Sequence, residues 1–107
     1  IISGGENIYP VQIEDFLRTN KAILDVAVIG LPDSRLGEIS AAIIELKPGE
    51  ECTEEDINVF CKKLPRYKRP RKVIFAHVPR NATGKIEKPK LREKYGADKL
   101  IADQNMG

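Results

Sequence analysis

The fold of this chain is decided by two apolar runs, Asp25-Val26-Ala27-Val28-Ile29-Gly30-Leu31 and Ile39-Ser40-Ala41-Ala42-Ile43-Ile44-Glu45-Leu46. The first run is short and rich in Val and Ile, which is typical of a buried strand. Pro32-Asp33 turns the chain after it, and the second run predicts another strand. Lys47-Pro48-Gly49-Glu50 then forms a strong turn. The sequence therefore predicts two consecutive strands, each followed by a turn.

A helix is predicted before these strands. It opens at Pro10, because a residue in the first turn of a helix needs no N–H. Ile13, Phe16 and Leu17 follow at helical spacing, and Asn20 can stop the helix.

A second helix is predicted after the strands. Thr53 and Asp56 approximate a capping box at its start, and Pro65 ends it. Its buried stripe repeats at i, i+3, i+4 and i+7, on Ile57, Phe60, Cys61 and Leu64.

The remaining part of the chain completes an α+β pattern. Residues 72–78 predict a third strand, and Pro89 starts a last short helix that Gly96 can cap. The expected fold is a small sheet of about three strands with helices packed on it. The sequence has no dinucleotide-binding fingerprint and no pattern of a parallel βαβ array.

Length and composition fit one small domain. The chain has 107 residues and a formal net charge of +2, which is too small to indicate nucleic-acid binding by itself. Basic residues cluster in 62–72 and 85–94, and acidic ones in 50–56. No stretch is long and apolar enough to span a membrane. The start is not a signal peptide and lacks Met, so we expect the inside of a longer chain.

Neither the cysteines nor the histidine predict a reactive site. Cys52 falls in a polar turn and Cys61 on the apolar face of a predicted helix, which indicates two reduced thiols in a cytosolic protein. No metal site is expected. His77 is the only histidine, lies in an apolar run and is interpreted as structural.

The segment Arg80-Asn81-Ala82-Thr83-Gly84-Lys85-Ile86 places a lysine directly after a glycine in a loop. A phosphate-binding P-loop is excluded, because it needs an earlier Gly at fixed spacing and a Ser or Thr after the lysine. Lys85 is either one exposed lysine among many or a side chain that projects into the cleft of another domain. Gly84 and the small residues 81–83 would permit this projection into another domain.

Two further segments also allow two interpretations. Gly4-Gly5 is either a flexible turn before a helix or a place where a ligand approaches the backbone. The run Arg66-Tyr67-Lys68-Arg69-Pro70-Arg71-Lys72 is either a solvated surface or an edge that binds phosphate.

Taken together, the opening Gly4-Gly5-Glu6-Asn7-Ile8-Tyr9-Pro10 and the segment around Lys85 resemble the C-terminal domain of the adenylate-forming superfamily, and within it the acyl-CoA synthetases. The resemblance runs through nearly the whole chain. Between the two ends it includes Gly30-Leu31-Pro32-Asp33, Gly37-Glu38, Tyr67-Lys68-Arg69-Pro70 and Leu91-Arg92. Several spaced motifs in the right order are more specific than any single one.

The resemblance implies the mobile C-terminal subdomain of an enzyme that activates a carboxylic acid with ATP and Mg²⁺ and transfers the acyl group to CoA. It implies that Lys85 is the catalytic adenylation lysine, which bridges the substrate carboxylate and the ATP α-phosphate. Gly4, Gly5 and Glu6 would line the tunnel for the pantetheine arm of CoA, and Arg69 and Arg71 would contact CoA phosphates. The domain would rotate between the half-reactions, presenting Lys85 and then the Gly4-Gly5-Glu6 loop from different faces.

The same resemblance sets the expected boundaries. Residues 1–102 would form the domain and 103–107 a flexible tail, with the hinge residue just before Ile1. The partner would be the enzyme's own N-terminal adenylation domain, and this chain alone would be inactive. The Glu6-Asn7-Ile8-Tyr9-Pro10 pattern differs from that of peptide synthetase adenylation domains and favours a cytoplasmic fatty-acyl or aryl-acid CoA ligase.

Two alternatives come from other classes of protein. A small basic nucleic-acid-binding α/β module would explain the cluster from Arg66 to Lys72, but only Tyr67 interleaves with the charges, and stacking platforms need more aromatics. The second alternative is a freestanding regulatory domain derived from such ligases.

Overall fold

The computed structural model describes residues 2–3, 6–35 and 37–96, and it has the predicted α+β fold. The main sheet of this described part contains β3 (Ile23–Asp33), β4 (Gly37–Leu46) and β5 (Lys72–Phe75) in the order β3-β4-β5. β3 and β4 form an antiparallel hairpin that pairs Val28 with Ala42, and β5 runs parallel to β4. A single β4–α2–β5 crossover therefore exists, although the sequence showed no array of such units.

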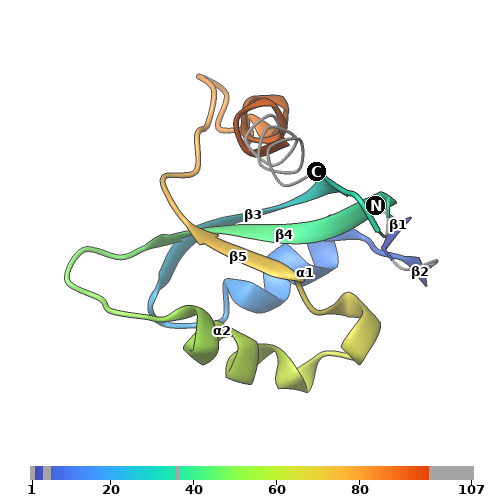
Figure 1. The fold of residues 1–107 in the computed structure, drawn as a ribbon. Helices are drawn as coiled ribbons and strands as arrows, with labels where there is room; N and C mark the ends of the chain where they lie inside the picture. Colours follow the sequence, from blue (N-terminus) through green and yellow to red (C-terminus); the bar gives the residue numbers. More distant parts are fainter. Residues whose placement is uncertain (1, 4–5, 36, 97–107) are drawn as a thin grey trace.

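Both faces of the sheet are covered (Figure 1). The helices α1 (Pro10–Leu17) and α2 (Glu54–Phe60) lie on one face, and the helical segment 88–96 lies over the other. Side chains alternate between the faces, so Val26 and Val28 join the first core cluster while Ala27 and Ile29 join the second. A strand that is buried on both faces favours apolar residues at successive positions, which explains the two apolar runs, and Ser40 is the buried polar residue in the second run.

The capping of α2 agrees with the sequence. Asp56 N–H donates to Thr53 Oγ1 at 3.1 Å, and Thr53 N–H donates to Asp56 Oδ2 at 3.0 Å. The helix itself ends at Phe60, and the last predicted turn is the 3₁₀ helix η1 (Cys61–Lys63) before Pro65.

Several other boundaries differ from the expectation. β1 (Ile2–Ser3) and β2 (Glu6–Asn7) form a separate antiparallel pair, and η2 (Arg66–Lys68) is a second 3₁₀ helix. β5 ends at Phe75 instead of residue 78. The expected boundary at residue 102 and the tail 103–107 lie outside the described residues.

The end of β5 has a specific cause. Ala76 N–H still donates to the Ile44 carbonyl at 3.0 Å, but Val78 N–H donates to the side chain of Glu45 at 2.9 Å. The carboxylate thus replaces the next backbone acceptor of β4, and the chain leaves the sheet toward the 80–86 loop.

The two cysteines are free thiols, as expected. Cys61 is 1% exposed, and its burial raises the pKa of the thiol to about 11, although the charge of Arg69 works in the opposite direction. Burial, followed by the charge of Asp56, also raises the pKa of Cys52. Because the thiolate is the reactive form, both shifts lower the reactivity of the thiols at neutral pH.

Candidate functional site

The loop that carries Lys85 is a tight hairpin. Arg80 and Ile86 form an isolated antiparallel bridge, and Asn81 N–H donates to the Lys85 carbonyl at 2.9 Å. Gly84 N–H donates to the Asn81 carbonyl at 2.9 Å, and Gly84 has a φ of 85°. Side chains rarely adopt that backbone conformation, so a glycine is required at this position.

The side chain of Asn81 fixes the inside of the hairpin. Its Oδ1 accepts hydrogen bonds from Thr83 N–H at 3.0 Å, Thr83 Oγ1 at 2.8 Å and Lys85 N–H at 3.0 Å. Lys85 itself is exposed, and its ammonium has no hydrogen bond or ion pair within residues 2–3, 6–35 and 37–96. The loop therefore presents a free cation from an ordered backbone.

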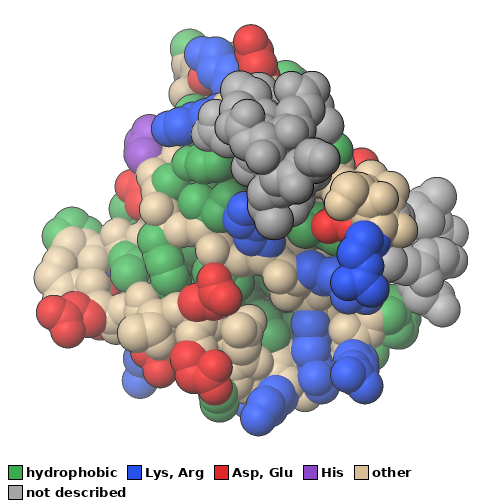
Figure 2. All heavy atoms as spheres, viewed as in Figure 1, with side chains coloured by type: hydrophobic (Ala, Val, Ile, Leu, Met, Phe, Trp, Pro, Cys, Tyr) green, Lys and Arg blue, Asp and Glu red, His purple; other side chains and the backbone are tan. Residues whose placement is uncertain are grey.

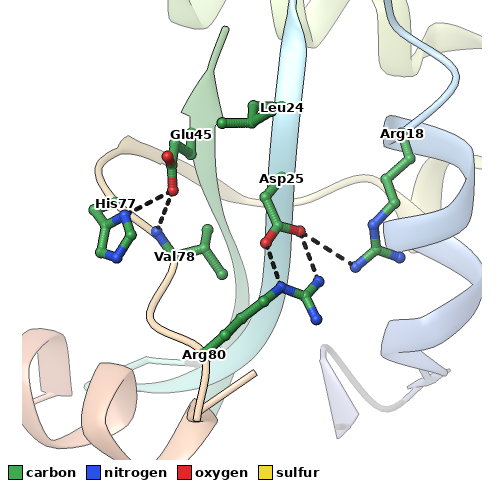
Figure 3. A pocket seen from close by; sticks show the side chains of 7 residues that line it. All are labelled: Arg18, Leu24, Asp25, Glu45, His77, Val78 and Arg80. Carbon is green, nitrogen blue, oxygen red and sulfur yellow. Dashed lines mark hydrogen bonds and ion pairs between the residues drawn. The ribbon is translucent and has the colours of Figure 1, made fainter. Parts of the chain in front are cut away.

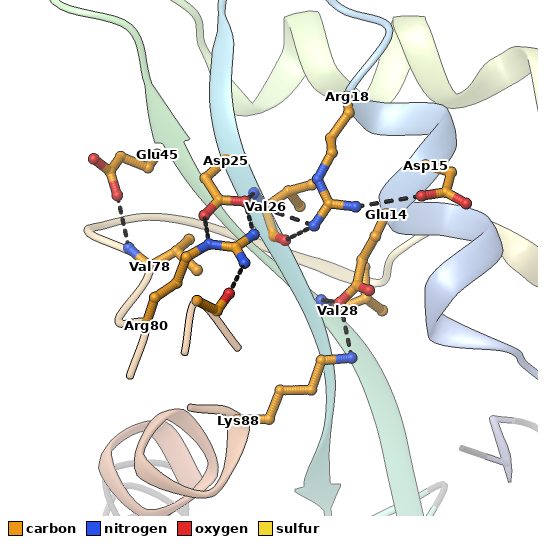
Figure 4. A network of polar contacts seen from close by, with 11 residues as sticks. Glu14, Asp15, Arg18, Asp25, Val26, Val28, Glu45, Val78, Arg80 and Lys88 are labelled. Carbon is orange, nitrogen blue, oxygen red and sulfur yellow. Dashed lines mark hydrogen bonds and ion pairs between the residues drawn. The ribbon is translucent and has the colours of Figure 1, made fainter. Parts of the chain in front are cut away.

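Arg80 connects this hairpin to strand β3. Its guanidinium donates to both oxygens of Asp25, from Nε at 2.7 Å and from Nη2 at 3.0 Å, while Nη1 donates to the Gly84 carbonyl (Figure 4). Asp25 is 15% exposed and also lies 3.6 Å from Arg18. Burial would raise the pKa of Asp25, but hydrogen bonds from Arg80 and Val26 N–H and the two arginine charges hold it below its ordinary value.

A second ion pair lies on the other side of the loop. Glu14 on α1 is 4% exposed, and its Oε2 accepts from Val28 N–H at 2.8 Å and from Lys88 Nζ at 2.8 Å. Sequence reasoning missed Glu14, Asp25 and Arg80, because the patterns along the chain say nothing of pairs this far apart.

A pocket of about 490 Å³ opens beside the base of this loop (Figure 3). His77 lies at its rim, and its Nδ1 is 2.9 Å from Glu45 Oε1. The His77 side chain is 78% exposed, so it does not pack in the core despite its apolar neighbours in the sequence. The residues lining the pocket are Arg18, Leu24, Asp25, Glu45, His77, Val78 and Arg80.

The two arginines predicted to contact CoA differ in their surroundings. Arg69 is half-buried, and it donates from Nε to the Leu64 carbonyl at 3.0 Å and from Nη2 to the Lys62 carbonyl at 3.1 Å. Arg71 is exposed and lines a hollow of about 320 Å³ together with Asp33, Arg35 and Ile39. On the face shown in Figure 2, Lys and Arg gather at the lower right and Asp and Glu at the lower left.

The predicted CoA-tunnel loop is only partly described. Gly4 and Gly5 lie outside the described residues, and Glu6 belongs to β2. In Figure 1 the 80–86 loop lies at the top of the domain and the β1–β2 pair at its right side. The roles of Gly4, Gly5 and Glu6 stay predictions.

Within 2–3, 6–35 and 37–96, no group of three or more His, Cys, Asp or Glu side chains could hold a metal ion. In the same ranges, no helix has the length and apolar character needed to cross a membrane.

Comparison with known proteins identifies the family. Residues 12–85 match the family model of the AMP-binding enzyme C-terminal domain. The medium-chain acyl-CoA ligase ACSF2 of Danio rerio is 52% identical over 96 residues, which are 88% of this chain and 16% of that protein. The long-chain-fatty-acid–CoA ligase FadD13 of Mycobacterium tuberculosis is 52% identical over 99 residues, or 91% of this chain and 20% of the relative.

Solved structures agree with these relatives. A Mycobacterium tuberculosis fatty acyl CoA synthetase has a TM-score of 0.82 and 50% identity, and the match covers 92% of this chain and 20% of that one. ATP-bound MatB from Rhodopseudomonas palustris has a TM-score of 0.85 at 35% identity, covering 90% and 20%. The chain belongs to the AMP-binding enzyme C-terminal domain family, as it occurs in acyl-CoA ligases. It spans a fifth or less of the length of these relatives.

Proposed function

We propose that this chain works as the C-terminal domain of a longer, cytoplasmic, ATP-dependent fatty-acid–CoA ligase and supplies its adenylation lysine. The observation that carries the proposal is the free ammonium of Lys85 on a braced hairpin, in a family whose relatives are acyl-CoA ligases. The names of FadD13 and ACSF2 support a fatty acid as the substrate. The ACSF2 relatives, by contrast, are mitochondrial.

The chemistry explains the need for a lysine. When a carboxylate attacks the α-phosphate of ATP, two anions meet, and negative charge builds up in the transition state. A fixed ammonium between them lowers the repulsion between the two anions and stabilises the negative charge of the transition state. Lysine provides a compact charge with several hydrogen-bond donors. The exposed end of the 80–86 hairpin is suited to reach into an active site on another domain.

CoA would be handled by a different part of the domain. Gly4, Gly5 and Glu6 would line the path of the pantetheine arm, after a rotation that withdraws Lys85. The exposed guanidinium of Arg71 fits a phosphate of the CoA nucleotide. Mg²⁺ would be held together with ATP by the N-terminal domain.

The proposal is tested by comparing the longer ligase chain with the 107-residue chain. The longer chain is expected to convert a fatty acid, ATP and CoA into acyl-CoA, AMP and pyrophosphate when Mg²⁺ is present. The 107-residue chain should be inactive, because we expect the nucleotide and acyl sites on the N-terminal domain. Tight binding of RNA or DNA in a salt-dependent gel-shift assay would favour the nucleic-acid-binding α/β module instead. A gene that encodes no ligase domain upstream of this segment would favour the freestanding regulatory domain.

The CoA contact is tested by two matched arginine variants. Arg71→Ala should raise the apparent KM for CoA about tenfold, increasingly so at low salt, and leave pyrophosphate release unchanged. Arg69→Ala removes two hydrogen bonds to carbonyls as well, so it should also lower stability by about 1–2 kcal/mol. Steady-state kinetics and melting curves separate the two effects. Loss of adenylation in Arg71→Ala would contradict the assignment.

A further inference from the structure

The geometry points to Arg80 and Asp25 as positioning residues for Lys85: their ion pair holds the 80–86 hairpin against strand β3, so that the lysine projects from a fixed base. This inference rests on the proposed adenylation role of Lys85. It extends that role to side chains that lie away from the reacting atoms.

One planar guanidinium joins the strand to the loop. Two N–H groups of Arg80 reach the two oxygens of Asp25 at 2.7 and 3.0 Å, and a third reaches the carbonyl of Gly84, the residue directly before Lys85. A bidentate pair fixes orientation as well as distance. A lysine at position 80 has one ammonium on a flexible stem and cannot reproduce this fork.

The downstream end of the loop is held in a similar way. Lys88 lies three residues after Lys85, and its Nζ is 2.8 Å from Glu14 Oε2. The same oxygen of Glu14 accepts the N–H of Val28 on β3. Figure 4 shows that the first anchor ends at Asp25 on β3 and the second at Glu14 on α1, which in turn bonds to Val28 on β3. The chain is therefore held directly to β3 before Lys85 and through Glu14 after it.

The anchors contact a packed part of the core. In the described sheet β3 is an edge strand, and side chains bond to the backbone groups of Val26 and Val28 on its outer side. Arg18 donates to the Val26 carbonyl at 3.2 Å, and Val26 N–H donates to Asp25 Oδ1 at 2.9 Å. Val26 and Val28 are 0% exposed. Asp25 and Glu14 therefore cannot move without disturbing packed residues.

A fixed base matters for Lys85 in particular. Four rotatable carbons separate its backbone from its ammonium, so any freedom of the loop adds to that of the side chain. Misplacement of a catalytic group by about 1 Å can cost about a hundredfold in rate. The hairpin bonds of Asn81 fix the shape of the loop, and Arg80 fixes its direction relative to the domain.

We call the hold of the Arg80–Asp25 ion pair on the 80–86 hairpin the clamp. Amide hydrogen exchange of the 107-residue chain, measured by NMR, tests the clamp without a measurement of enzyme activity. Arg80→Ala should accelerate exchange of the Gly84 and Lys85 amides about tenfold, while the Val28 amide in β3 stays protected. Arg18→Ala is the matched control, because Arg18 shares Asp25 but does not contact the loop. Unchanged loop exchange in Arg80→Ala, or equal acceleration in both variants, would overturn the clamp.

Kinetics of the two half-reactions in the longer ligase test whether the clamp matters for adenylate formation. Arg80→Ala and Asp25→Asn should slow adenylate formation about ten- to a hundredfold through kcat and leave acyl transfer from a supplied acyl-adenylate unchanged. Adding Arg80→Ala to Lys85→Ala should cause no further loss, because Arg80 acts through Lys85. A further loss there, or equal losses in both half-reactions, would overturn the inference. If Lys85→Ala alone left adenylation intact, the proposed function would fail, and the exchange experiment would still decide the clamp.

Discussion

Lys85→Ala is expected to slow adenylate formation by about a hundred- to a thousandfold in the longer ligase, which corresponds to about 3–4 kcal/mol. The loss is large because the ammonium acts where two anions meet and is already oriented by its hairpin. Acyl transfer from a supplied acyl-adenylate should be spared, because the proposed rotation withdraws the lysine from that step. Pyrophosphate exchange and thioester formation are measured separately.

Controls separate chemistry from folding. The melting temperature should barely change, because an exposed loop lysine adds little to the core. Acetylation of Lys85 should mimic the substitution, since it removes the same charge. Lys90→Ala is a matched control, because Lys90 is also exposed but pairs with Glu87 at 3.2 Å. Equal losses in both half-reactions, or a similar loss in Lys90→Ala, would remove the case for Lys85.

The parts of the fold that the sequence predicted are those set by local patterns. Apolar runs rich in Val, Ile and Ala placed β3 and β4, since a strand buried on both faces favours apolar residues at successive positions. The Thr53–Asp56 capping box and the stripe through Ile57 placed α2. Lys85 was singled out because Gly84 and the small residues before it would let the lysine project, and the resemblance then implied a role that stays a prediction.

The parts that could not be predicted depend on contacts across the chain. Asp25 and Arg80 are 55 residues apart in sequence, and no periodicity links them. The same holds for Glu45, whose side chain ends β5 by accepting from Val78 N–H. Arg69 lies in a basic run that allowed a solvated surface or a phosphate-binding edge, and two bonds of its guanidinium go to carbonyls after α2. Only three-dimensional placement distinguishes it from the exposed Arg71.

The second large effect is expected on stability, from Glu14→Ala. The substitution leaves the buried N–H of Val28 without its acceptor and the ammonium of Lys88, 23% exposed, without its partner. Breaking such a pair from one side costs about 3 kcal/mol, because an uncompensated charge stays partly buried. For a domain of this size the loss lowers the melting temperature by roughly 12–24 °C. Thermal and urea unfolding of the 107-residue chain measure it.

Comparison with related variants identifies the cause of the loss. Glu14→Gln keeps an acceptor for Val28 N–H and removes only the charge, so it should lose about half as much. Combining Glu14→Ala with Lys88→Ala should cost less than the sum of the single changes, because the second removes the stranded ammonium. Glu93→Ala, an exposed glutamate on segment 88–96, should stay within about 0.5 kcal/mol of the parent. If Glu14→Ala were as mild as Glu93→Ala, the ion pair that ties Lys88 to α1 and β3 would not be what holds this side of the hairpin.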